Sequence, residues 1–205
     1  MRTAIAVSFL SAIAWLSVST RAAAQDGSMN AYIPAPPQPF EPRFSLGLYA
    51  LGWEAEYSGA GVGGRAGWQP LSWLGVEVFS EHLLVEHRDS SRHDHPIGFN
   101  LTFPIPIGDT LRLKPLFGFC AVFSFIDPVQ PSGERADDVL FGAHAGLAAE
   151  MSLSERWSFF VELQGIAYVG HGRYVHGWSS AIDGTMRVWG TVQGAAGVQF
   201  NFHAL

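Results

Sequence analysis

The chain has 205 residues, of which 48% are hydrophobic and only 15% are charged. This composition is too apolar for a disordered chain and too poor in charge for a typical water-soluble domain. A formal net charge of −6 argues against a surface that binds the phosphates of nucleic acid. Because Cys120 is the single cysteine, an intramolecular disulfide framework and a multi-cysteine zinc or iron–sulfur site are excluded.

The first residues have the pattern of a secretory signal peptide. Arg2 precedes an apolar run over residues 4–18, and the alanines at 22–24 offer the small side chains that signal peptidase accepts. We predict cleavage between Ala24 and Gln25, which makes residues 1–24 the signal peptide. The apolar run is shorter than the roughly 20 residues that a membrane-spanning helix needs, so a retained helical anchor is the less favoured alternative.

Residues 25–42 form the next predicted segment, which contains five prolines and no hydrophobic period. Proline removes backbone donors and favours extended conformers. We therefore predict a stiff periplasmic linker between the signal peptide and the folded part of the chain.

From Arg43 onward, apolar residues alternate with small or polar residues at a period of two, which predicts β-strands. The fifth run is the clearest, because Phe117 and Phe119 share one parity while Arg112 and Lys114 share the other. Every charged residue within the runs falls on this second parity. The eight predicted strands occupy residues 44–50, 62–69, 74–81, 97–105, 111–125, 141–151, 157–168 and 187–202.

The second parity is rich in glycine, serine, threonine, asparagine and glutamine, which suits a narrow interior, while the apolar parity suits contact with lipid. A secreted soluble barrel of the lipocalin type is the alternative, and it would turn its bulky apolar residues inward. We predict an all-β fold, an eight-stranded antiparallel up-and-down transmembrane β-barrel over residues 43–205.

The predicted connections alternate in length along the chain. Tight turns are expected at residues 70–72, 106–110 and 152–156, and long loops at residues 83–95, 126–138 and 170–185. Bacterial outer-membrane barrels have short periplasmic turns at one rim and longer extracellular loops at the other. Tryptophans near the turns, at positions 68, 73 and 157, predict an aromatic girdle. The sequence thus predicts the outer membrane, with both barrel termini in the periplasm.

With this pattern, residues 43–202 resemble the small outer-membrane barrels related to the transmembrane domain of OmpA and its porin-like relatives. The segments at residues 113–119 and 146–150 carry the resemblance together with the alternation. It implies outer-membrane lipids and the barrel assembly machinery as partners. Barrels of this family typically end on an aromatic residue, whereas this chain ends with Phe202, His203, Ala204 and Leu205.

An eight-stranded barrel has a lumen narrow enough for side chains to fill. Unpaired ions in such a space would lose their hydration without compensation, so we predict paired charges that form a plug. A gated path for an ion or ligand is the alternative. The predicted network consists of Arg65, Glu77, Glu81, Arg112, Lys114, His144, Glu150, Glu162 and Arg187.

Two further groups of residues suggest chemistry that we do not predict. The loop expected at residues 83–95 and its flank contain four histidines, at 82, 87, 93 and 95, with acidic residues at 81, 86, 89 and 94. Imidazole and carboxylate suit zinc or nickel, but this spacing matches no established motif, so we predict a polar surface loop without metal. His176 and Ser179 superficially resemble the pair in lipid A deacylase barrels, although their spacing differs.

The sequence therefore predicts a non-enzymatic outer-membrane barrel without cofactor, whose long loops serve surface recognition, adhesion or envelope integrity. A narrow channel or transporter for small solutes is the main alternative, and a lipid A-modifying enzyme is a weaker one. Fold alone does not name the extracellular ligand.

Overall fold

The computed structural model describes residues 40–54, 58–87, 90–128, 136–170, 180–181 and 187–203. The predicted signal peptide and most of the predicted linker lie outside these residues. No helix in the described part is long and apolar enough to cross a membrane. The strands are, in chain order, β1 (Arg43–Glu54), β2 (Ser58–Leu71), β3 (Leu74–His87), β4 (Ser90–Thr102), β5 (Ile105–Ile107), β6 (Leu111–Pro128), β7 (Ala136–Ser152), β8 (Trp157–Gly170), β9 (Ser180–Ala181) and β10 (Arg187–His203).

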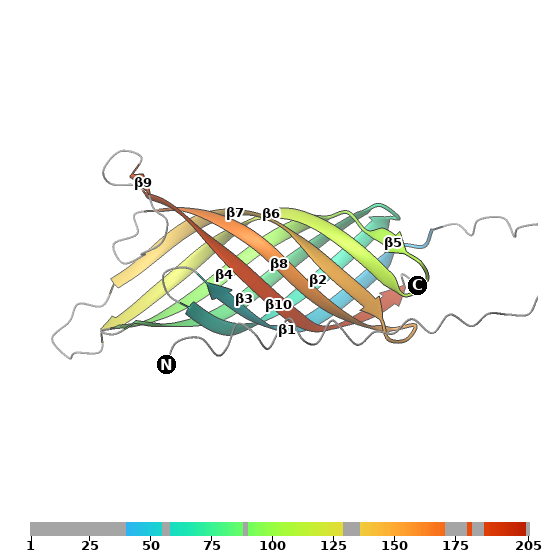
Figure 1. Ribbon diagram of the computed structural model, residues 1–205, viewed down its shortest axis with the longest axis horizontal. Coiled ribbons are helices and arrows are strands. Elements are labelled where there is room, and N and C mark those ends of the chain that lie inside the picture. The colour runs from blue at the N-terminus through green and yellow to red at the C-terminus, as the bar shows by residue number, and fades with distance from the viewer. Residues whose placement is uncertain are drawn as a thin grey trace, which may run out of the picture. The chain divides into compact units, whose positions relative to one another are not determined.

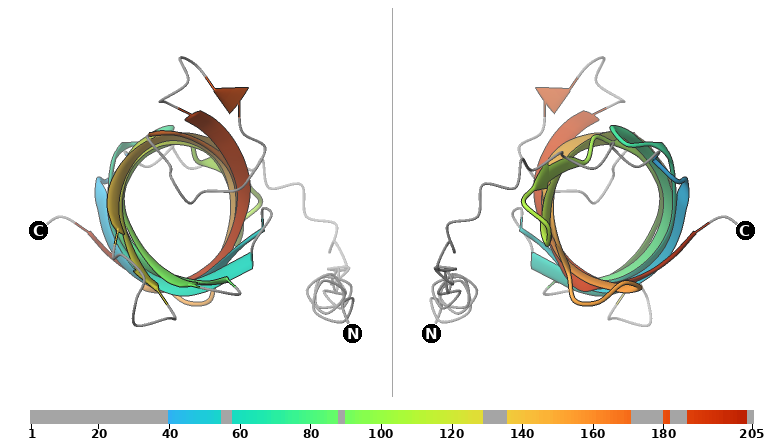
Figure 2. Two further views of the ribbon diagram at one scale, coloured as in Figure 1. Left: turned by 90° about the vertical axis from the view of Figure 1, so that its left-hand side faces the viewer. Right: turned by 90° about the vertical axis from the view of Figure 1, so that its right-hand side faces the viewer.

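Eight long strands close into a barrel, which Figure 1 shows from the side and Figure 2 along its axis. Each long strand pairs antiparallel with the next one along the chain. β1 also pairs with β10, from Arg43 opposite His203 to Glu54 opposite Val192. The short strands β5 and β9 pair only with β6 and β10, respectively. Closure leaves no long strand with an unpaired edge, and the predicted eight-stranded antiparallel up-and-down barrel is confirmed.

Side chains alternate between the two faces of the barrel wall. Along β8, Trp157 and Phe159 are exposed outward while Ser158 and Phe160 are buried inside. The same alternation places Leu48 on the outer face, where 72% of the residue is exposed. The apolar parity therefore covers the outside of the barrel, as the sequence predicted, and a soluble barrel of the lipocalin type is excluded.

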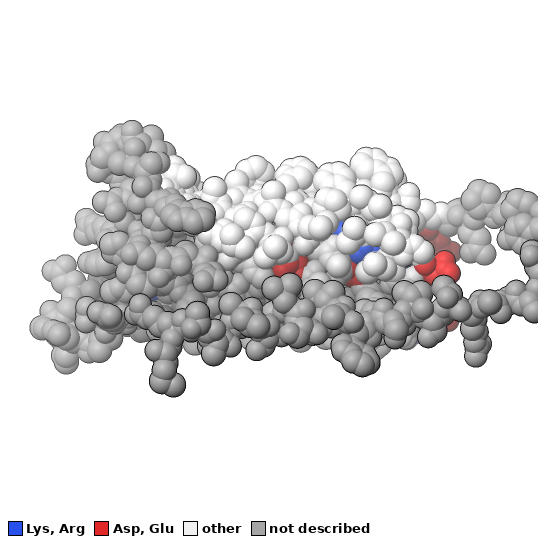
Figure 3. All heavy atoms as spheres, viewed as in Figure 1, with Lys and Arg blue, Asp and Glu red and all other residues white. Residues whose placement is uncertain are grey.

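Exposed charged side chains mark the end of the barrel with the short turns. Among the residues whose side chains the structure describes, the exposed charged ones are Glu41, Asp109, Glu155 and Arg156, which lie before β1 and in the short turns. On the face in view in Figure 3, uncharged atoms cover most of the described wall, and the charged atoms gather toward the same end. The tryptophans predicted as a girdle, at positions 68, 73 and 157, are all exposed near this end.

Two of the predicted long loops are wrong in their bounds, because the strands continue into them. β3 extends to His87 and β4 begins at Ser90, where a loop over residues 83–95 was predicted. Likewise, β6 extends to residue 128 and β7 begins at residue 136. In β3, Leu83 and Val85 are apolar residues that point inward. In this part of β3 both faces carry apolar residues, so polar and apolar residues no longer alternate before the strand ends.

The turn before β6 is also shorter than predicted. β5 takes up residues 105–107, which leaves the turn to residues 108–110. Gly108 has a φ of 67°, a left-handed conformation that glycine adopts without steric cost.

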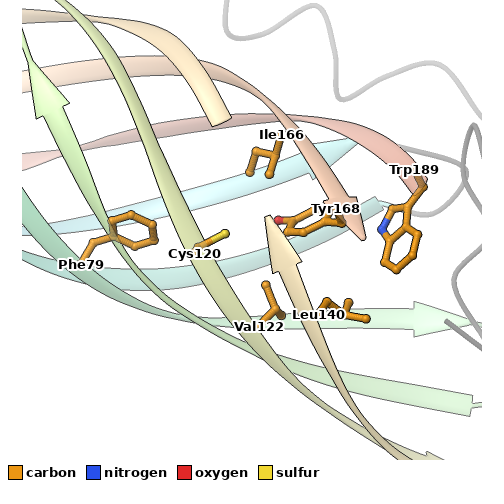
Figure 4. Packing of buried hydrophobic residues seen from close by; sticks show 7 residues of the cluster. All are labelled: Phe79, Cys120, Val122, Leu140, Ile166, Tyr168 and Trp189. Atoms are coloured by element: carbon orange, nitrogen blue, oxygen red, sulfur yellow. The ribbon is translucent and has the colours of Figure 1, made fainter. Parts of the chain in front are cut away.

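The interior contains apolar packing that the sequence did not predict, since its alternation places small and polar residues inside. One cluster draws side chains from β3, β6, β7, β8 and β10, and Figure 4 shows them converging. Its members are Phe79, Cys120, Val122, Leu140, Ile166, Tyr168 and Trp189. A second cluster consists of Tyr49, Leu51, Leu83 and Phe160. Most of this packing lies in the half of the barrel away from the short turns.

Candidate functional site

Charged side chains meet inside the barrel in the half nearer the short turns. Glu77 of β3 accepts a hydrogen bond from Lys114 Nζ at 2.6 Å and another from Arg65 Nη1 at 3.4 Å. Lys114 Nζ also lies 3.3 Å from Glu150 Oε2, and Arg112 Nη1 lies 3.5 Å from Glu150 Oε1. One carboxylate therefore joins two cations, and a second carboxylate extends the chain of ion pairs.

The network also reaches across the barrel. Arg65 of β2 donates from Nη1 to Glu162 Oε2 of β8 at 2.9 Å, although β1 and β10 separate these strands in the ring. The Arg65 guanidinium carbon lies 3.5 Å from the centroid of the Phe160 ring, a cation–π contact. We call Arg65, Glu77, Arg112, Lys114, Glu150 and Glu162 the lumen ion-pair network. Its three positive and three negative side chains balance, which limits the cost of burying them.

Glu81 takes a different role from the one predicted for it, because neutral donors hold its carboxylate. Tyr49 Oη donates to Glu81 Oε1 at 2.9 Å, and Gln193 Nε2 lies 3.1 Å and 3.2 Å from the two carboxylate oxygens. Among the described side chains, no cation pairs with it. This group lies beyond the lumen ion-pair network along the barrel axis, at the level where the apolar packing begins.

His144 and Arg187, the other two residues of the predicted network, do not join the ion pairs among the described side chains. His144 of β7 donates from Nε2 to Asn100 Oδ1, and its ring packs edge-on against Phe79 with centroids 5.6 Å apart. It therefore fills space between the polar and apolar halves rather than joining the ion pairs. Arg187 begins β10, and its side chain lies outside the described part of the chain.

A further buried ion pair lies in the opposite half of the barrel, beside the connection between β3 and β4. Arg92 and Asp94 pair within β4, and Ser124 Oγ donates to Asp94 Oδ1 at 2.6 Å. The Arg92 guanidinium carbon lies 5.5 Å from the centroid of a Trp53 ring. Sequence reasoning missed this group because it assigned Arg92 and Asp94 to a loop. It also missed the polar partners Tyr49, Asn100 and Gln193, although all three lie on inward parities.

Little space remains around the lumen ion-pair network. A pocket of about 30 Å³ opens beside Glu77, Lys114 and Arg112 at the short-turn end. Such a volume holds a water molecule or two. Arg43 and Gln199 line the same pocket. The arrangement thus suits a filled interior in which side chains neutralise one another.

The histidines of the predicted polar loop belong to strands. His82 lies in β3, and His93 and His95 lie in β4, all on the outer parity. His87 ends β3, and its side chain is outside the described part of the chain. Asp94 points the other way, into the barrel, with none of its surface exposed. In the described part of the chain, no group of three or more histidine, cysteine or acidic side chains is arranged to hold a metal ion. His176 and Ser179 lie outside the described residues.

No protein-family model and no curated protein matches the chain. Solved structures do match it. A major outer membrane protein from Thermus thermophilus aligns with a TM-score of 0.56 at 13% identity, over 78% of this chain and 99% of that one. Neisserial surface protein A aligns with a TM-score of 0.53 at 10% identity, over 78% and 97%. The outer membrane protein OprG from Pseudomonas aeruginosa aligns with a TM-score of 0.52 at 13% identity, over 80% and 97%.

At these identities the similarity concerns the fold. The chain has the fold of the small outer-membrane β-barrels, and the resemblance predicted from its strand pattern is confirmed at that level. The alignments cover nearly the whole of each matched chain. The roles of the lumen residues and of the connections therefore have to be derived from this chain.

Proposed function

We propose that the chain is an integral protein of the bacterial outer membrane, with both barrel termini in the periplasm. The apolar outer wall supports this location, because lipid is the solvent in which such a surface is stable. The short turns at residues 108–110 and 153–156 support the orientation, since outer-membrane barrels have their short turns at the periplasmic rim. Outer-membrane lipids and the barrel assembly machinery are its proposed partners.

Within that membrane the barrel acts as a sealed, non-enzymatic anchor. The observation that carries this proposal is the connection between Arg65, Glu77 and Lys114, whose buried ion pairs link β2, β3 and β6 through the lumen. The apolar cluster of Figure 4 lies farther along the same lumen and adds a second obstruction. A permeating ion would have to break ion pairs in one half and leave water in the other.

An anchor of this kind places its biological role in the connections at the far rim. We propose that they serve surface recognition, adhesion or envelope integrity. The similarity in fold to a protein named for the Neisserial surface supports a role at the cell surface.

Conductance in planar lipid bilayers tests the sealed anchor. The purified barrel should give no steady current above that of protein-free bilayers. Steady currents that change when Glu77 or Lys114 is substituted would overturn the anchor and establish the alternative, a narrow channel for small solutes.

Cysteine labelling in intact cells tests the orientation. The native Cys120 is buried, and a Cys120→Ser background removes its thiol from the measurement. A membrane-impermeant maleimide should label Ser132→Cys and leave Asp109→Cys unlabelled until the outer membrane is permeabilised. The reverse pattern would reverse the proposed orientation.

Unchanged lipid A acylation on expression is expected for a protein without enzymatic activity, and loss of acyl chains would contradict that.

A further inference from the structure

Three histidines meet on the outer face of β3 and β4, beside the exposed Ser80. The register places Ser80 opposite Ile97 and Leu83 opposite Asp94, so His82 faces His95 across the pair formed by β3 and β4. Directly opposed residues on neighbouring strands have Cβ atoms about 4.5–5.5 Å apart. The two rings therefore meet by virtue of the backbone register.

The contact between these rings is made through one particular atom of each. His82 Nδ1 and His95 Nδ1 lie 3.3 Å apart, and the ring centroids lie 4.5 Å apart. Without a metal, one Nδ1 donates its proton to the other. Two nitrogens bound to one tetrahedral zinc ion at about 2.0–2.1 Å are separated by about 3.3–3.4 Å. The observed spacing already matches that of two ligands of one ion.

The pair lies toward the far rim of the wall, since His82 is five residues before the end of β3 and His95 is five residues after the start of β4. Both histidines are partly exposed and line a groove on the outer wall together with Leu48, Val62 and Val198. Phe125 of β6 packs edge-on against His95, with centroids 5.7 Å apart, and fixes the ring from the side. The Asp94 carboxylate is inside the barrel and therefore is not a ligand at this site on the outer face.

We propose that His82 and His95 form a binding site for a divalent transition-metal ion, zinc being the ion that fits the spacing, with water as the remaining ligands. Binding needs the donated proton to move from Nδ1 to Nε2 of the same ring, and the rings to turn so that both Nδ1 lone pairs point at the ion. His93, whose ring centroid lies 5.7 Å from that of His82, is a neighbouring imidazole outside the pair. The inference goes beyond the proposed anchor and does not depend on whether the lumen conducts.

The test measures zinc binding by the folded full chain in detergent, produced without a polyhistidine tag and freed of metal by chelator. Competition with a chromophoric chelator should give one ion per barrel. His82→Gln and His95→Gln should each weaken binding by about tenfold or more, since each removes one of two protein ligands. Cobalt(II) added in place of zinc should give the visible absorption of tetrahedral coordination in the wild type and lose it in both variants.

Two matched variants separate this site from general binding to histidine. His144→Gln removes an imidazole from inside the barrel, and His93→Gln removes the neighbouring one on the same face. Both should bind zinc within about threefold of the wild type. Faster migration of the unheated protein in detergent gels checks that each variant is folded.

The proposal is overturned if the wild type binds zinc no tighter than about 1 mM. It is equally overturned if His82→Gln and His95→Gln bind as the wild type does, or if His93→Gln alone abolishes binding.

Discussion

Neutralising one carboxylate inside the barrel should cost a measurable part of its stability. Glu77→Gln keeps the size of the side chain but removes the charge that Arg65 and Lys114 share at 3.4 Å and 2.6 Å. The lumen ion-pair network then changes from three positive and three negative side chains to three and two, with a net charge of +1.

The expected magnitude follows from the partners that remain. Breaking a buried ion pair by removing one partner typically costs about 3–5 kcal/mol. Here Arg65 keeps Glu162 at 2.9 Å, and Lys114 keeps Glu150 at 3.3 Å. Because neither cation is left alone, we expect the free energy of unfolding to fall by about 2–3 kcal/mol.

Urea unfolding of the barrel in lipid vesicles, followed by tryptophan fluorescence, measures this change. Glu155→Gln is the matched control, because it makes the same replacement at an exposed turn residue and should stay within about 0.5 kcal/mol of the wild type. Lys114→Gln combined with Glu77→Gln restores neutrality, so the two changes together should cost less than the sum of the single changes. A Glu77→Gln barrel as stable as the Glu155→Gln barrel would refute the role given to the network.

Three other substitutions test separate parts of the structure by the same unfolding measurement. Leu163→Arg puts a cation on the outer wall, where 61% of the residue is exposed, and should cost about 2–4 kcal/mol in lipid; an unchanged stability would contradict a lipid-facing wall. Tyr49→Phe removes the 2.9 Å hydrogen bond to Glu81 and should cost about 1–3 kcal/mol; an unchanged stability would contradict a stabilising role for this bond. Gly108→Ala has no atom within 4 Å of the added methyl, so any loss, about 1–2 kcal/mol, reports the left-handed backbone alone, and no loss would mean that the turn relaxes.

The period of two was enough to predict the barrel, because it reports which side of the wall a residue faces. It could not predict where β3 ends, since Leu83 and Val85 are as apolar as the outward residues beside them. The inner face changes from charged to apolar partway along the barrel. In the half away from the lumen ion-pair network, inward positions carry both apolar residues such as Leu83 and polar ones such as Asp94, so polarity alone does not identify the inner face there.

The sequence also predicted which charges face inward better than it predicted their partners. Arg65 and Glu162 are 97 positions apart and meet only because the closed barrel brings β2 and β8 to face each other. Glu81 was grouped with paired charges, whereas two neutral donors hold it. The pairing of His82 with His95 follows from the register of one hairpin, formed by β3 and β4. Extending the strands to residues 87 and 90 was the step that the pattern did not supply.

The pairing of β1 with β10 closes the barrel and decides when its sheet loses its free edges. Twelve residue pairs join the first strand to the last, and they connect positions about as far apart in the chain as the barrel allows. Contacts this distant in sequence form late and slowly. A chain that stops before residue 187 has every other long strand but keeps two unpaired edges, on β1 and β8, which are templates for aggregation. Pairing of the final seventeen-residue strand with β1 is therefore the event that turns an aggregation-prone sheet into a self-contained molecule.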